Sequence, residues 1–125
     1  MTEQLDQIAH DMFAAVERGD IPALNAMWSD DVTVWRLGGG RTRDKRRALK
    51  VLDWFVGATR DRRYELLDRE VFEGGFVQQH VLHATTHAGG EISLRVCMVV
   101  KVAANGLITR IEEYFDPAEL APLSA

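Results

Sequence analysis

Near its C-terminal end the sequence places one carboxylate, Glu113, between two apolar residues of the same strand face. Side chains alternate across a strand, so Ile111, Glu113 and Phe115 share one side. Burial disfavours the charged form of a carboxylate and leaves it protonated or paired with a cation. Glu113 is therefore the predicted catalytic acid or base, and Ile111 and Phe115 are predicted to contact the substrate.

A histidine-rich segment offers a second group for proton transfer. Histidine titrates near neutral pH, so His83 is assigned as the catalytic partner of Glu113 and His80 as a substrate contact. The two residues lie three positions apart and have opposite strand parity, so at most one faces the pocket unless a bulge intervenes. A structural role is the alternative for each histidine.

The histidines do not predict a metal site. The spacings between His80, His83 and His87 do not bring the rings together on a strand as they would on a helix. We therefore expect neither a metal nor a cofactor. The single cysteine, Cys97, lies in an apolar strand without a nearby base and is predicted to be a structural thiol.

Arg36 and Arg95 are the candidate substrate-binding cations. Arg36 shares a strand face with Val34, which indicates a cleft position, and it would stabilise an enolate or a carboxylate on the ligand. The opposite face of the strand that carries Arg95 is wholly apolar, so the place of Arg95 depends on which face forms the core. An ion pair of Glu113 with Arg36, Arg95 or Arg110 is the structural alternative.

Aromatic residues and a basic run are the last candidates for ligand binding. Trp54 or Phe55 is expected at the mouth of a pocket, while the other tryptophans are expected in the core. The basic run from Arg41 to Arg47 resembles an anion-binding patch. It lacks interleaved aromatic residues, so a solvated helix face is predicted and no nucleic-acid partner is expected.

The elements that position these residues are helices followed by strands. Apolar residues recur at helical intervals from Thr2 to Arg18, and Gly19 is a plausible terminator. Asp20 caps a second helix with Pro22 in its first turn. Glycine-containing turns separate the last four strands and favour antiparallel hairpins. The remaining predicted elements are a strand over Val32–Leu37, a helix over Asp44–Thr59 with Asp44 as its plausible cap, and strands over Tyr64–Phe72, Phe76–His87, Glu91–Val102 and Leu107–Phe115.

Length and composition predict one ordinary globular domain over residues 1–125. The chain has 46% hydrophobic and 27% charged residues, with no repeat or linker. A net charge of −4 gives no general attraction to nucleic acid or to an anionic membrane. No leader or membrane-spanning run is recognisable, and one cysteine fits a reducing compartment, so the protein is predicted to be cytoplasmic.

This order of elements predicts an α+β fold with helices packed on one face of a curved, mostly antiparallel sheet. The stretches "AAVERGDIPALNAMWSDDVTVW", "TRDKRRAL" and "GLITRIEEYFDPAELAPL" resemble the nuclear transport factor 2-like superfamily, in particular its SnoaL-like branch. The resemblance covers nearly the whole chain. It implies a cone-shaped fold, a hydrophobic small-molecule substrate and a homodimer formed through the sheet. Arg95 would then face the pocket, and the apolar side of its strand would be the dimer interface.

The superfamily includes ketosteroid isomerases, limonene epoxide hydrolases, polyketide cyclases, scytalone dehydratase and non-catalytic binding modules. The base and the two oxyanion-binding groups of a ketosteroid isomerase map to Arg36, Met12 and Arg95. Arginine is not a base near neutral pH and methionine donates no hydrogen bond, so that activity is not expected.

The residues of a limonene-type epoxide hydrolase are only partly present. Its final-strand aspartate maps to Glu113, but the arginine and second aspartate of the middle strand map to Val81 and His83. The tyrosine and asparagine that hold the water map to Val34 and Arg36. Arg36 could supply the missing cation from the neighbouring strand.

Three functions therefore remain open. The first is a cofactor-independent acid–base enzyme of the isomerase, cyclase or dehydratase type. The second is an epoxide hydrolase with an altered charge network. The third is a ligand-binding dimeric module without catalysis.

Overall fold

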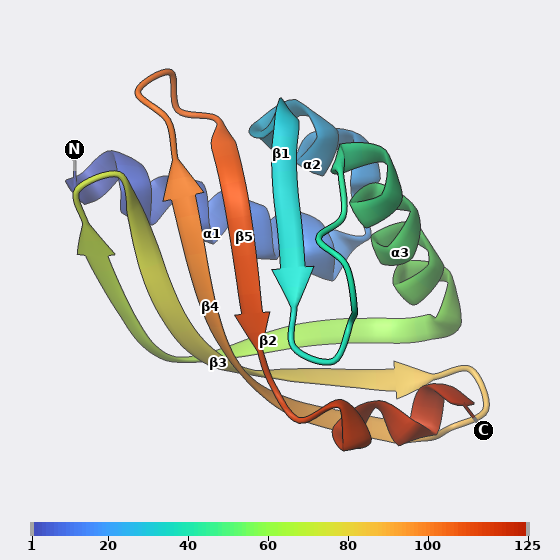
Figure 1. The fold of residues 1–125 in the computed structure, drawn as a ribbon. Coiled ribbons are helices and arrows are strands. Elements are labelled where there is room, and N and C mark those ends of the chain that lie inside the picture. Colours follow the sequence, from blue (N-terminus) through green and yellow to red (C-terminus); the bar gives the residue numbers. More distant parts are fainter. Residues whose placement is uncertain (1, 125) are drawn as a thin grey trace.

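Five strands form one mixed sheet in the order β1-β5-β4-β3-β2, and helices cover one of its faces (Figure 1). The computed structural model describes residues 2–124. The elements are α1 (Thr2–Arg18), α2 (Ile21–Met27), β1 (Trp28–Arg36), α3 (Lys45–Ala58), β2 (Thr59–Phe72), β3 (Gly75–Thr86), β4 (Glu91–Val102), β5 (Ile108–Tyr114) and the 3-10 helix η1 (Pro117–Ser124).

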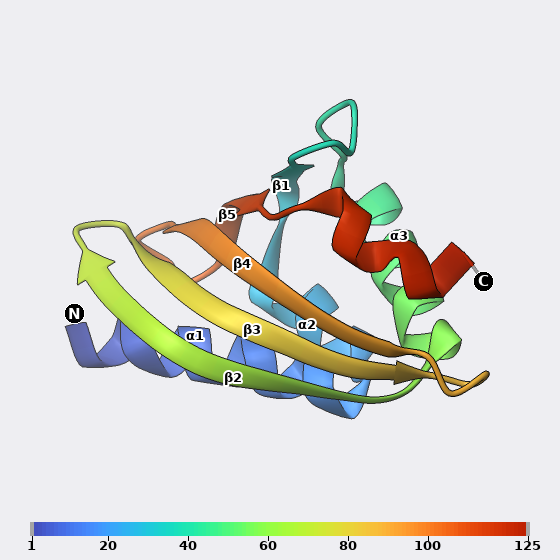
Figure 2. The same ribbon diagram turned by 90° about the horizontal axis from the view of Figure 1, so that it is seen from below.

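The predicted α+β fold is confirmed. Strands β2, β3, β4 and β5 pair antiparallel in succession, as the glycine turns predict, and β1 joins β5 in parallel. Figure 2 shows that β2, β3 and β4 curve together. Helix α1 runs alongside β2, and the C-terminal η1 lies near the beginning of β4.

The helix ends follow from capping residues that the sequence identifies. Gly19 has a φ of 71°, which a glycine adopts without strain, and it ends α1. The Asp20 carboxylate accepts a hydrogen bond from the backbone N–H of Ala23 at 3.1 Å and begins α2. The Asp44 carboxylate does the same for Arg47 at 3.0 Å and begins α3.

Two strands begin four or more residues before their predicted starts because helix and strand meet without a loop. Trp28 has an extended backbone and is the first residue of β1, four positions before the predicted start at Val32. Its N–H still bonds the Leu24 carbonyl. Thr59 likewise caps α3 and already begins β2, five positions before the predicted start at Tyr64.

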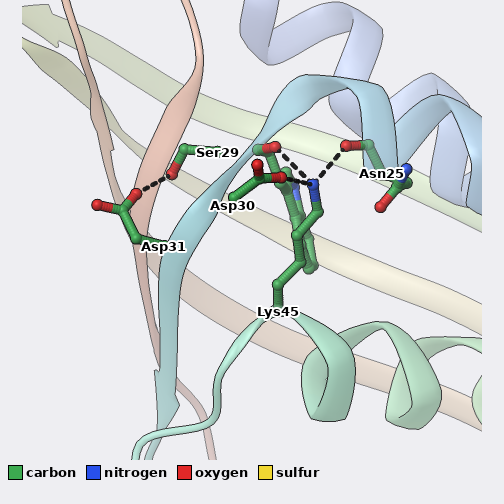
Figure 3. Close-up of polar contacts among 6 residues, drawn as sticks. Asn25, Ser29, Asp30, Asp31 and Lys45 are labelled. Carbon is green, nitrogen blue, oxygen red and sulfur yellow. Dashed lines mark hydrogen bonds and ion pairs between the residues drawn. The ribbon is translucent and has the colours of Figure 1, made fainter.

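A lysine holds the start of α3 against the end of α2 (Figure 3). Lys45 Nζ donates to the carbonyl oxygens of Asn25 at 2.8 Å and Trp28 at 2.9 Å. The Asp30 carboxylate lies 3.5 Å from the same nitrogen. Carbonyls at a helix C-terminus lack helical partners, so a buried ammonium that reaches them stabilises the junction.

We expect Lys45→Met to lower the free energy of unfolding by about 1.5 kcal/mol, because two carbonyls lose a charged donor. The side chain of Lys45 is only 15% exposed, so little water replaces the lost bonds. Lys50→Met on the exposed side of α3 is the matched control and should change stability by less than about 0.5 kcal/mol. Urea denaturation of both variants makes the comparison, and equal losses would contradict the role of Lys45.

The wholly apolar side of β4 is the core of the monomer, which corrects two expectations. Its residues are buried under the helices; they are Ile92, Leu94, Val96, Met98, Val100 and Val102. That side is therefore not a dimer interface, and the homodimer itself stays a prediction. Arg95 points to the opposite, exposed face, where its guanidinium donates to Gln79 at 3.2 Å. The expectation that Arg95 faces the pocket is wrong, because strand alternation places it opposite the buried residues.

Within residues 2–124, no helix combines the length and the apolar character needed to cross a bilayer.

Candidate functional site

A cavity of about 320 Å³ lies between the inner face of the sheet and the helices. Its size falls within the usual range of small-molecule sites, at the lower end. Most of its wall is apolar, and its ionisable lining residues are Arg36, Arg43, Tyr64, His80 and Glu113. A mostly apolar space with a few polar groups is the arrangement expected for a hydrophobic ligand that is held in one orientation.

The structure places Glu113 in the cavity wall, between its strand neighbours Arg36 on β1 and Met98 on β4. In the described part of the chain its carboxylate forms no hydrogen bond and no ion pair within 4 Å. Burial raises the pKa of Glu113, and the charges of Arg36 and Arg43 oppose this shift without cancelling it. Glu113 is therefore available both to hold a proton and to release it.

Arg36 lies at the end of β1, on the same strand face as Val34. Its side chain passes over Gly39, where an added Cβ would lie 2.7 Å from Arg36 Cγ. The glycine turn after β1 thus leaves the room that the guanidinium needs. Burial lowers the pKa of Arg36, and the charge of Arg43 adds to this effect, while Glu113 opposes it.

Arg43 is a cavity residue that the sequence did not predict. The loop after β1 turns back, and Arg43 pairs with Val34 through two backbone hydrogen bonds of 2.9 and 2.7 Å. This antiparallel bridge brings Arg43 into the lining beside Arg36. A triglycine turn between two extended segments was the available signal, since it predicts a hairpin-like return. The expectation of a solvated helix face is wrong for Arg43 and correct for Arg46 and Arg47, which are exposed on α3.

Tyr64 is the second cavity residue that the sequence missed. The Glu17 carboxylate at the end of α1 accepts a hydrogen bond from the Tyr64 backbone N–H at 2.8 Å, which fixes β2 against the helix. Burial raises the pKa of Tyr64, and the negative charges of Glu113 and Glu17 raise it further. The phenol is therefore a permanent donor, and its hydroxyl forms no hydrogen bond to any described residue.

His80 is buried at 1% exposure and lines the cavity. Its ring packs edge-on against Tyr64, at a centroid distance of 4.8 Å, and against Phe13 at 5.1 Å. The burial of His80 lowers its pKa to about 4, with a smaller contribution from the charge of Arg69. His80 is therefore neutral at physiological pH and serves as a hydrogen-bonding group.

The expectation that His83 shares the pocket with Glu113 is wrong. His83 lies on the outer face of β3, where its Nε2 is 2.8 Å from the Glu65 carboxylate and its Nδ1 is 3.3 Å from the Ser93 hydroxyl. The strand is regular here, so His80 and His83 point to opposite faces. Only one of the two histidines faces the cavity, as their opposite strand parity predicted, and that residue is His80.

The predicted apolar contacts all border the cavity. Ile111 and Phe115 are buried beside Glu113, as alternation along the last strand predicts. Trp54 and Phe55 both contribute to the lining, although only one of them was expected there. Trp54 is 56% exposed, which places it at the mouth of the cavity.

Metal-ligating side chains do not cluster in residues 2–124, where no group of three His, Cys, Asp or Glu is arranged to hold an ion.

One further hydrogen-bond donor borders the cavity. Trp28 lines it, and the Trp28 indole nitrogen is the one buried side-chain polar atom of the described residues without a hydrogen-bond partner.

Comparison with known proteins agrees with this architecture. The family model described as SnoaL-like domain matches residues 9–111. No curated protein matches the sequence.

Solved structures share the fold at low sequence identity. A pinacolase, BvnE from Penicillium brevicompactum, has a TM-score of 0.85 at 14% identity, over 98% of this chain and 93% of that one. An epoxide hydrolase from M. tuberculosis, described as LEH-like, has a TM-score of 0.79 at 20% identity, over 98% and 89% of the two chains. An NTF2-like protein of unknown function from Burkholderia pseudomallei has a TM-score of 0.80 at 20% identity, over 96% of both chains.

At these identities the structural likeness establishes the nuclear transport factor 2-like fold and leaves the reaction open. The family model covers most of the sequence, from the middle of α1 into β5. The chain belongs to the SnoaL-like domain family.

Proposed function

We propose that the protein is a cofactor-independent acid–base enzyme that acts on a hydrophobic small molecule. The reaction class is isomerisation, cyclisation or dehydration. The observation that carries the proposal is the Glu113 carboxyl, which lies without a partner among the described residues in an apolar cavity that also contains Arg36 and Arg43. A carboxyl whose pKa burial shifts towards neutrality is suited to take up a proton and to return it.

The proton transfer follows from this arrangement. Ionised Glu113 removes a proton from a carbon next to a carbonyl of the substrate, and the electron pair moves to the carbonyl oxygen. Arg36 or Arg43 stabilises the oxyanion. Glu113, now protonated, then returns the proton to another carbon, which gives an isomer, or to a leaving hydroxyl, which departs as water.

The two arginines also favour substrates with an acidic group. Arg36 and Arg43 have no carboxylate within 4 Å among residues 2–124. Two arginines lie in the cavity with one carboxyl, so at least one positive charge stays uncompensated beside an apolar space even when Glu113 is ionised. A hydrophobic molecule with a carboxylate or an acidic enol fits this combination.

A ligand screen followed by isotope exchange tests the proposal. Steroid, terpene and polyketide libraries are screened by thermal shift, and each binding ketone is then incubated with the protein in D₂O. We expect deuterium at carbons next to the carbonyl, at a rate that depends on the protein. Bound ketones that show neither exchange nor turnover would favour a non-catalytic binding module instead.

Arg36→Met should weaken binding of a hydrophobic carboxylate about tenfold or more, because a charged hydrogen bond contributes about 1.5 to 3 kcal/mol. The same variant should bind the corresponding primary amide almost normally. Arg47→Met is the matched control, since Arg47 is exposed on α3. Isothermal titration with the acid and the amide measures both effects. If the acid and the amide lose affinity equally, Arg36 does not recognise a charge.

Epoxide hydrolysis is the second candidate, favoured by one specific observation. Glu113 lies within electrostatic reach of two arginines, so the carboxylate–arginine grouping expected of such a site is present with Arg36 and Arg43 as its cations. Hydrolysis in ¹⁸O-labelled water should then give diols that carry the label. Absence of labelled diol across a panel of terpene epoxides would exclude this alternative.

A further inference from the structure

A chain of polar side chains leads from the protein surface to the inner wall of the cavity. The Asp6 carboxylate on α1 accepts a hydrogen bond from Arg69 Nη1 at 2.8 Å. Arg69 Nε donates to Gln78 Oε1 at 2.8 Å. The Gln78 amide nitrogen lies 3.0 Å from His80 Nδ1. Gln78 is only 2% exposed, so both ends of its amide are committed to these two partners.

This chain determines which nitrogen of His80 carries the proton. Arginine only donates hydrogen bonds, so the atom of Gln78 that faces Arg69 must be the amide oxygen. The amide nitrogen then faces His80 and can only donate, which makes Nδ1 an acceptor. In the neutral ring the proton therefore lies on Nε2.

The Nε2–H group of His80 is left for a ligand. It forms no hydrogen bond with any of residues 2–124, and the His80 ring lines the cavity. Phe13 from α1 and Tyr64 from β2 hold the ring edge-on from two sides. The charged groups of the chain, Arg69 and Asp6, lie behind Gln78, so the nitrogen presented to the cavity is a neutral donor.

We propose that His80 Nε2–H binds an uncharged carbonyl oxygen of the ligand at the part of the cavity wall formed by Phe13, Tyr64 and His80, with Gln78 as the positioning residue. The substrate class is thereby narrowed to molecules with an apolar body, an uncharged ketone oxygen at His80 and, at Arg36 and Arg43, either the reacting carbonyl or an acidic group. The low pKa of His80 agrees with this assignment, since a ring that stays neutral does not attract an anion. The inference rests on the proposed function for its substrate, whereas the ring tautomer is testable without any turnover.

The first test is the ¹⁵N NMR spectrum of the histidine rings, with the His80 signals assigned from the His80→Phe variant. We expect a protonated Nε2 and an unprotonated Nδ1 in the wild type at pH 7. Gln78→Glu should reverse this pattern, because a carboxylate only accepts and draws the proton to Nδ1. Gln79→Glu on the exposed face of β3 is the control and should leave the His80 signals unchanged. A wild-type ring that is protonated on Nδ1 alone, or on both nitrogens, would overturn the assignment.

The second test compares two ligands of the same shape, 6-acetyl-2-naphthoic acid and 6-isopropenyl-2-naphthoic acid. The second compound replaces the carbonyl oxygen by a methylene group. We expect the wild type to bind the ketone about tenfold more tightly, and His80→Phe to lose the preference. Equal affinity of the wild type for both compounds would refute the carbonyl site. Glu113→Gln should keep the preference, so a failure of the acid–base proposal is distinguishable from a failure of this one.

Discussion

Replacement of Glu113 by glutamine is expected to lower turnover of a substrate at least about a hundredfold, because general acid–base catalysis contributes factors of this size or more. The amide has nearly the same shape but neither takes up nor releases a proton. The variant should stay folded, since Glu113 forms no ion pair with any described residue that its removal would break.

Glu112→Gln is the matched control for this prediction. Glu112 is the neighbour of Glu113 on β5 and is paired with Arg110 at 3.1 Å. Its loss should change turnover less than about twofold, because strand alternation points it away from the cavity. Steady-state kinetics of the two variants makes the comparison. Full activity of Glu113→Gln would rule out Glu113 as the acid or base.

Glu113 should also make stability depend on pH in a defined direction. Its pKa in the folded protein is raised above the ordinary value of 4.5, so between these two pKa values the folded state holds more protons than the unfolded state. Stability then falls as the pH rises through this window and levels off above the folded pKa. Denaturation of the wild type and of Glu113→Gln at a series of pH values should show that the free energy of unfolding of the variant lacks this fall with rising pH. A wild type that gains stability over the same window relative to the variant would contradict a raised pKa.

Arg62→Met is expected to lower the free energy of unfolding by about 3 kcal/mol, because its guanidinium forms several partly buried hydrogen bonds. Arg62 reaches the C-terminal carbonyls of two helices. Its guanidinium donates to Val16 at 3.1 Å and Glu17 at 3.4 Å in α1, and to Val56 at 3.3 Å in α3. It also bonds the carbonyl and the hydroxyl of Thr59, at 3.2 and 2.7 Å. Both helix ends would lose the guanidinium as a second donor and its favourable charge together.

Arg62→Lys separates the geometry of the guanidinium from its charge, and Arg60→Met is the matched control. Arg62→Lys should restore less than half of the lost stability, because an ammonium does not reach partners on both helices as the planar guanidinium does. Arg60→Met, on the exposed side of the same strand, should change stability by less than about 0.5 kcal/mol. Chemical denaturation measures all three. If Arg62→Met were as mild as Arg60→Met, the hydrogen bonds of Arg62 would not stabilise the helix ends.

Local patterns in the sequence were sufficient for most of the fold. The caps at Asp20 and Asp44 and the terminator Gly19 lie where the sequence puts them, because each depends only on near neighbours. Alternation brings Ile111 and Phe115 to the inner face together with Glu113. It fails earlier in the same strand, where Ile108 is also buried, because the pairing of β5 with β4 skips one residue at Thr109.

The errors at the site have a different origin. Whether Arg95 or the apolar side of β4 faces inward depends on where the helices pack, which alternation alone does not state. Strand parity showed that His80 and His83 lie on opposite faces of the sheet, but it did not show which of them faces the cavity. Tyr64 reaches the cavity where a helix-to-strand hydrogen bond joins distant segments, which no local pattern reveals. Arg43 reaches it through a backbone bridge for which the triglycine turn was a local but unused signal.

Glu113 is assigned as the catalytic acid or base because burial in the cavity wall raises its pKa above the usual value of glutamate. The most direct measurement is a ¹³C NMR titration of the glutamate side-chain carboxyls, in which the Glu113 signal is the one that disappears in Glu113→Gln. We predict a pKa above the ordinary value of 4.5 for this signal, against the opposing charges of Arg36 and Arg43. A pKa at or below 4.5 would contradict this assignment, since Glu113 would then be an arginine-stabilised carboxylate that is too weak a base to remove a proton from carbon.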